Sequence, residues 1–140
     1  MRVSVLMVLF LLTTLNSFSQ SEDVLSKCAS KIDSVTKREV YIITDTMPEF
    51  PGGVDSLMKF ISYNIRWPNT GEECMGKVYI SFIVETDGTL SDFKILRGIC
   101  ENYDNEAMRV VKMLPPFSPG KCKGMAVPVN YIIPIRFQLQ

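Results

Sequence analysis

The sequence predicts an α+β fold, a small antiparallel sheet with two helices packed on one face. Apolar residues alternate with a period of two on either side of a turn in residues 75–95 and again in 127–139, which is typical of half-buried strands. They recur at helical spacing in residues 54–64 and 104–114. With a short strand at residues 40–43, the order is strand, helix, strand, strand, helix, strand, which favours a sheet covered by both helices.

Residues 1–19 have the composition of a signal peptide. Arg2 precedes an apolar run, and Ser17 and Ser19 place small side chains where a signal peptidase requires them, so we expect cleavage before Gln20. A membrane anchor is the alternative, but it needs about 20 consecutive apolar residues, roughly twice the length of this run. We therefore expect an exported protein, with association with a membrane as the open alternative.

Composition favours a binding protein that is not an enzyme. Fifteen basic residues balance fifteen acidic ones, so the charge predicts no nucleic-acid partner. Histidine is absent, which removes the commonest general base and the commonest metal ligand. We expect no cofactor, no metal and no small-molecule substrate. Residues 20–38 are polar and predict either a leader or a short amphipathic helix, and we expect one domain over residues 39–140.

The first strand and first helix are separated by a loop. Residues 40–43 are β-branched and aromatic, and they end before the proline- and glycine-rich loop 47–53. Helix 54–64 follows, and it ends before Trp67-Pro68 because a residue that precedes proline disfavours the helical conformation. Met58 lies in the apolar stripe of this helix, so we expect it in the core.

A hairpin is expected around the turn Thr86-Asp87-Gly88, between strands at residues 75–85 and 90–95. The apolar parity changes between Leu90 and Phe93, which predicts a bulge. After helix 104–114, a loop leads to the last strand, 127–139. We expect this strand to lie antiparallel beside the first hairpin strand, with its other edge exposed.

Four cysteines are expected to form disulfides, which persist in an oxidising compartment. In a hairpin around this turn, two residues lie opposite each other when their numbers sum to about 174. Cys74 and Cys100 meet this condition, which favours a bond between them. Cys122 should lie at the other end of the sheet, where Cys28 is its remaining partner. No two cysteines lie closer than about 20 residues, so their spacing does not indicate a metal site.

The last strand is expected to offer its open edge to a partner. Pro128 and Pro134 are both even-numbered, and neither has a backbone N–H. If the even-numbered residues bonded to the neighbouring strand, the sheet would lose two hydrogen bonds. We therefore expect the even residues to face the open edge. The candidate partner-binding residues, which keep a donor there, are Asn130, Ile132, Arg136 and Gln138.

Arg97, Glu106 and Arg109 are charged residues near the second helix and the hairpin. We expect an ion pair among them to brace the helix against the hairpin, and a ligand-facing role is the alternative.

Three ordered motifs lie within residues 45–140. Their residues are Pro48, Phe50, Pro51, Gly52, Gly53, Trp67, Pro68, Gly76, Asp87, Gly88, Glu106, Ala107, Arg109, Pro119 and Gly120. In this order and spacing they resemble the C-terminal domain of TonB-family energy transducers, in the short periplasmic form. The family commonly has Tyr-Pro where Trp67-Pro68 stands.

This resemblance implies a periplasmic domain that holds the extended TonB box of an outer-membrane TonB-dependent receptor by strand addition. Such domains couple the proton-motive force of the inner membrane to nutrient uptake. We expect no retained inner-membrane anchor and no long proline-rich spacer in this chain. Residues 20–40, fully extended, would reach at most about 70 Å.

Other functions stay open at this point. The main alternative is an envelope adaptor or regulator that binds peptidoglycan or another protein, and an inner-membrane transducer complex is a further possible partner. A thiol oxidoreductase is disfavoured because the sequence has no Cys-x-x-Cys motif.

Overall fold

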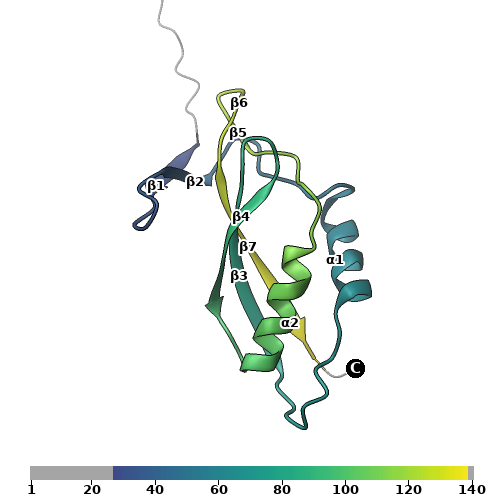
Figure 1. Cartoon of the computed structure of the whole chain (residues 1–140). Coiled ribbons are helices and arrows are strands. Elements are labelled where there is room, and N and C mark those ends of the chain that lie inside the picture. The colour runs from purple at the N-terminus through teal and green to yellow at the C-terminus, as the bar shows by residue number, and fades with distance from the viewer. Residues whose placement is uncertain (1–26, 139–140) are drawn as a thin grey trace, which may run out of the picture.

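Five strands form the main sheet of the computed structural model, which describes residues 27–138 (Figure 1). The strand order is β1-β2-β7-β3-β4, and the strands are β1 Ala29–Ile32, β2 Glu39–Ile43, β7 Val129–Phe137, β3 Gly76–Val84 and β4 Leu90–Arg97. Helices α1 Gly53–Asn64 and α2 Glu101–Lys112 pack on one face of this sheet. The predicted α+β class is confirmed. The expected signal peptide lies outside the described residues.

The core lies between this face and the helices. The even-numbered residues of β3 and the odd-numbered residues of β7 point into it, as their alternation predicts. Helix α2 contributes Ala107, Val110 and Val111, which are fully buried, and α1 contributes Leu57 and Ile61. None of the helices between residues 27 and 138 has both the length and the apolar character needed to cross a membrane.

The hairpin and the last strand are arranged as predicted. β7 pairs antiparallel with β3 along the whole of both strands, from Gly76 opposite Phe137 to Val84 opposite Val129. β3 also pairs antiparallel with β4, and this register shifts between Ser81 and Ile83. Asp92, which lies opposite the shift, has a positive φ of 51°. The bulge predicted from the change of parity is therefore confirmed.

The sheet is mixed, which corrects the prediction of an antiparallel sheet. β2 runs parallel to β7 and pairs with it at one position, Tyr41 opposite Val129. These two strands are about 90 residues apart in the chain, so no turn between them sets their relative direction. Local sequence patterns therefore carry no information about this pairing.

Three short strands, β1, β5 and β6, were not predicted. Residues 29–32 form β1, so the interpretation of residues 20–38 as a leader or a helix is wrong there, and the sheet begins before residue 39. All four residues of β1 are exposed, so no burial pattern marks it. A two-stranded ribbon of β5 Lys121–Cys122 and β6 Met125–Ala126 replaces the loop expected before the last strand, which begins at Val129.

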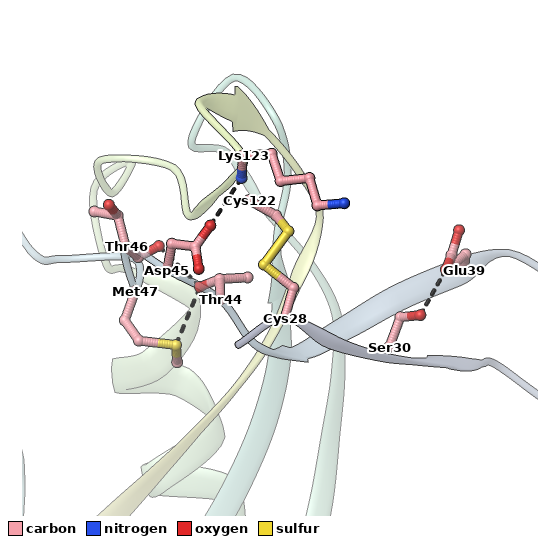
Figure 2. The surroundings of a disulfide bond; sticks show 9 residues. All are labelled: Cys28, Ser30, Glu39, Thr44, Asp45, Thr46, Met47, Cys122 and Lys123. Atoms are coloured by element: carbon pink, nitrogen blue, oxygen red, sulfur yellow. Dashed lines mark hydrogen bonds between the residues drawn. A yellow bond between two sulfur atoms is a disulfide. The ribbon is translucent and has the colours of Figure 1, made fainter. Parts of the chain in front are cut away.

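Besides the pairing of β2 with β7, three links between side chains hold the β1–β2 hairpin to the rest of the domain. Arg38 forms an ion pair with Glu85 at 2.7 Å, and Asp33 forms one with Lys94 at 3.5 Å. A disulfide joins Cys28, just before β1, to Cys122 in β5 (Figure 2). Val40 of β2 is buried. These links extend the domain to the N-terminal side of the predicted boundary.

The second disulfide joins Cys74, before β3, to Cys100, which caps α2. Its Cα atoms are 6.4 Å apart, and those of Cys28 and Cys122 are 6.1 Å apart. Both separations lie within the range of disulfide bonds. The hairpin register favours the bond between Cys74 and Cys100, and Cys28 with Cys122 is the pairing that remains. The two bonds tie opposite ends of the sheet.

We predict that Val110→Asp unfolds the domain, whereas Lys112→Asp has little effect. Val110 is 0 % exposed, and burying an unpaired carboxylate costs several kcal/mol, a large part of the stability of a small domain. Lys112 is exposed on the same helix, so it controls for the introduced charge. Thermal melts followed by circular dichroism measure the difference. Equal melting temperatures would contradict the assigned buried face of α2.

We predict that Gly88→Ala is more destabilising than Gly71→Ala. Both glycines have a positive φ, 87° and 77°, so each substitution strains the backbone by about 1 kcal/mol. A Cβ on Gly88 would also overlap the carbonyl of Phe117, whereas a Cβ on Gly71 would meet open space. Overpacking adds about 1 to 3 kcal/mol for Gly88→Ala alone. Urea unfolding compares the two variants, and equal losses would show that crowding at Gly88 is relieved without cost.

Candidate strand-binding edge and groove

The outer edge of β7 is open along most of its length. β2 covers this edge at Val129 only, and no other strand among residues 27–138 pairs with the edge beyond that point. The opposite edge of β7 is fully paired with β3. The open part of β7 therefore presents unpaired backbone groups, which can receive another extended chain.

One hydrogen bond shows which residues of β7 face the outer edge. The N–H of Tyr41 in β2 donates to the carbonyl of Pro128 at 2.8 Å. Backbone groups of successive residues point to opposite edges, so the outward direction at Pro128 is repeated at every second residue of the strand. Ile132, Pro134 and Arg136 therefore face the open edge, as their parity predicts. Ile132 and Arg136 offer both an N–H and a carbonyl, and Pro134 offers a carbonyl alone.

The four candidate partner-binding residues do not all lie on the open stretch. Ile132 and Arg136 lie on it, and Gln138 follows immediately after the end of β7. Asn130 stands next to the paired residue Val129, and in a parallel pair the residues that flank the paired one face the neighbouring strand. Asn130 and Ile132 both line a separate cavity of about 370 Å³ beneath the β1–β2 hairpin, but only Asn130 flanks the residue that pairs with β2. The structure thus places Asn130 on the covered part of the edge.

A groove of about 810 Å³ follows the open edge. One wall comes from α1 and the segment that follows it, and the other comes from the ends of β3 and β7. The residues that line it are Met58, Ile61, Ser62, Ile65, Trp67, Lys77, Pro134, Arg136 and Gln138. The helical wall is mostly apolar, whereas Lys77 and Arg136 make the strand wall basic.

Two apolar residues of the helical wall are about half exposed. Met58 is 45 % exposed, so its placement in the core was wrong. Trp67 is 46 % exposed, and its ring packs edge-on against Phe137 at 5.8 Å and Tyr103 at 6.1 Å. An apolar residue on an amphipathic helix predicts a buried position. It does not show whether that position faces a packed element or an open groove. Met58 was therefore missed as a groove residue.

Glu106 and Arg109 form a brace that supports this wall. Arg109 donates hydrogen bonds of 2.7 Å to the Glu106 carboxylate and to the carbonyl of Asn64 at the end of α1. Glu106 also accepts a hydrogen bond from the backbone N–H of Arg66 at 2.6 Å. The hydrogen bond from the Arg109 side chain lowers the pKa of Glu106. The brace therefore joins α2 to the end of α1, not to the hairpin, and exposed Arg97 takes no part in it.

The remaining motif residues build the scaffold behind the groove. Phe50 is buried and packs against Phe60 and Phe117. Gly52 and Gly53 adopt positive φ values where the chain enters α1. The motif residues in loops, turns and the start of β3 are Pro48, Pro51, Pro68, Gly76, Asp87, Gly88, Pro119 and Gly120, and Ala107 lies in the core on α2.

Two groups of cysteine and carboxylate side chains come close together in the described residues. Asp45 lies near Cys28 and Cys122, and Glu72 lies near Cys74 and Cys100. Each pair of cysteines is a disulfide, so neither group can supply the thiolate that a metal would need.

Two NMR solution structures of Helicobacter pylori TonB-CTD are similar to the chain, each at 21 % sequence identity. The first has a TM-score of 0.46 and covers 60 % of this chain and 90 % of that one, and the second has a TM-score of 0.41 and covers 64 % and 89 %. No curated protein matches the sequence. Residues 72–139 match the model of the Gram-negative bacterial TonB protein C-terminal family, so this part of the chain is a TonB-family C-terminal domain.

Proposed function

We propose that this chain is a periplasmic binding module that holds the TonB box of an outer-membrane TonB-dependent receptor by strand addition, in support of energy-coupled nutrient transport. Domains of this family take part in TonB-dependent transport. The observation that carries the proposal is the open stretch of β7 from Ile132 to Arg136, which is paired on one side only. An extended receptor segment would complete the sheet there.

The groove beside the edge supports the same mode of binding. In strand addition, main-chain hydrogen bonds supply affinity, and alternate side chains of the added strand enter pockets on either face. Ile132 and Arg136 would exchange main-chain hydrogen bonds with the partner. Side chains on the helical face of the added strand would contact Met58, Ile65 and Trp67.

We predict that Ile132→Pro weakens binding of receptor peptides by about five-fold or more and leaves the fold nearly intact. The substitution removes one outward N–H donor, and a hydrogen bond contributes about 1 kcal/mol. Ile132→Ala is the matched control, because it removes the side chain and keeps the donor. Titration with peptides from the N-terminal plug regions of TonB-dependent receptors measures affinity. Thermal melts measure the fold.

Ile133→Pro should instead damage the fold. Ile133 is 1 % exposed, and its backbone faces β3. If Ile133→Pro melts like the wild type while Ile132→Pro unfolds the protein, the odd-numbered residues of β7 face the open edge, and the assignment of the even-numbered ones is wrong. If no receptor peptide binds and the wild-type protein sediments with peptidoglycan sacculi, the protein is an envelope adaptor and the receptor-binding proposal is wrong.

A further inference from the structure

The cavity of about 370 Å³ beneath the β1–β2 hairpin lies between the hairpin and the sheet face away from the helices. The residues that line it are Lys31, Ile32, Asp33, Ser34, Val40, Ser81, Ile83, Asp92, Lys94, Leu96, Asn130 and Ile132. Its volume falls in the range of small-molecule sites, about 300 to 1,000 Å³. None of these residues lines the groove beside β7, so the cavity is separate from that groove.

Two polar side chains on the floor of the cavity, which the sheet forms, have no partner in the described part of the chain. Ser81 is 5 % exposed and Asn130 is half-buried, and neither side chain forms a hydrogen bond within residues 27–138. Every fully occluded side-chain nitrogen or oxygen of those residues does have a partner. The Ser81 hydroxyl and the Asn130 amide therefore open into the cavity, where a ligand can complete their hydrogen bonds.

The sheet register sets the distance between these two polar groups. Ile83 of β3 lies opposite Asn130 of β7, and Ser81 is two residues from Ile83, so Ser81 and Asn130 are diagonal neighbours on adjacent strands. The Cα atoms of such neighbours are about 7 to 8 Å apart, and their side chains stand on the same face. A hydrogen bond spans about 2.9 Å, so one small polar group between the two side chains can bond to both.

The other residues of the cavity favour a ligand that is uncharged and aliphatic. Val40 of the hairpin and Ile83 of the sheet are 1 % and 4 % exposed, so the most buried walls are aliphatic. Two cations and two carboxylates also line the cavity, and they are Lys31, Lys94, Asp33 and Asp92. Lys94 and Asp33 already form an ion pair. A charged ligand would lose its hydration and would meet no excess of opposite charge.

We infer that this cavity binds a small aliphatic molecule whose inner end is an uncharged carboxamide. A carboxamide has both donors and an acceptor, as have serine and asparagine, so it can donate to one of Ser81 and Asn130 and accept from the other. The aliphatic body would pack between Val40 and Ile83. The inference does not depend on receptor binding, so it can fail while the proposed function stands.

Three molecules of one shape test the inference: isovaleramide, methyl isobutyl ketone and isovalerate. The ketone lacks the amide donor, and isovalerate carries a charge in place of the amide. Each is titrated into the isotope-labelled protein, and the backbone amide NMR shifts are followed. We expect isovaleramide to bind with a Kd on the order of 1 mM and to shift the amides of Val40, Ser81 and Asn130 most. The ketone and isovalerate should bind at least about five-fold more weakly, because each loses a hydrogen bond.

Variants of the protein assign this preference to the floor of the cavity. Ser81→Ala and Asn130→Leu each remove one polar partner and change the side-chain shape little. Each should reduce the preference for isovaleramide over the ketone, and the double variant should abolish it. Ser62→Ala removes a hydroxyl from α1 outside the cavity, so it should leave the preference unchanged. Thermal melts check that the variants are folded.

Three results of these titrations would overturn the inference. If isovaleramide causes no saturating shift at the cavity, the cavity holds only solvent. If the amide and the ketone bind equally, the aliphatic walls bind without recognising an amide. If the preference survives in the double variant, the recognition lies elsewhere.

A blocked glutamine, N-acetylglutamine N-methylamide, separates a small molecule from a protein side chain that carries the same group. We expect it to bind more weakly than isovaleramide, because its two blocked ends must also fit the cavity. Tighter binding of the blocked glutamine would assign the carboxamide to a protein partner, and the small-molecule ligand would be wrong.

Discussion

The antiparallel ladder between β3 and β7 is the interaction on which the rest of the molecule depends. It runs through all nine residues of each strand, and it aligns Val78 with Ile135 and Ile80 with Ile133 on the face that both helices cover. The same register decides which backbone groups of β7 bond to β3 and which remain for another strand. Core packing and the open edge therefore follow from one pairing. A shift of the register by one residue would exchange the buried residues of β7 with the exposed ones, and the paired backbone groups with the open ones.

The β1–β2 hairpin determines how much of the edge stays open. β2 approaches β7 closely enough to pair only at Tyr41, and the hairpin contacts the opposite side of the sheet through Arg38 and Asp33. The disulfide from Cys28 to Cys122 ties the start of the hairpin to the ribbon that precedes β7. Because the hairpin is attached at both of these places, it covers the beginning of the edge and leaves the stretch from Ile132 onward without a strand partner among the described residues.

Elements with a buried face were predictable from the sequence, and elements that depend on distant contacts were not. Apolar residues alternate in β3 and β7, and the alternation changes parity at the bulge. Both patterns predict burial directly, because each apolar position indicates the face that is buried. β1 is exposed throughout, so the sequence carries no such record of it. Proline parity identified Ile132 and Arg136 as outward-facing, but the covering of Asn130 depends on β2, whose position along β7 is not encoded locally. The groove at Met58 is likewise visible only once α1 and β7 are placed together.

An open edge is also a place where copies of the same chain can join, and the residues of this edge work against that. Proline and charged side chains on an edge strand hinder its pairing with another copy. A second β7 aligned in parallel would set Arg136 against Arg136, where the charges repel. A second β7 aligned antiparallel about Pro134 would set Arg136 against Ile132, and the cation would again lack a carboxylate. Residues 132–136 contain no acidic side chain, so neither alignment neutralises Lys77 and Arg136. The missing N–H of Pro134 and the charge of Arg136 therefore both work against pairing of β7 with a second copy of itself.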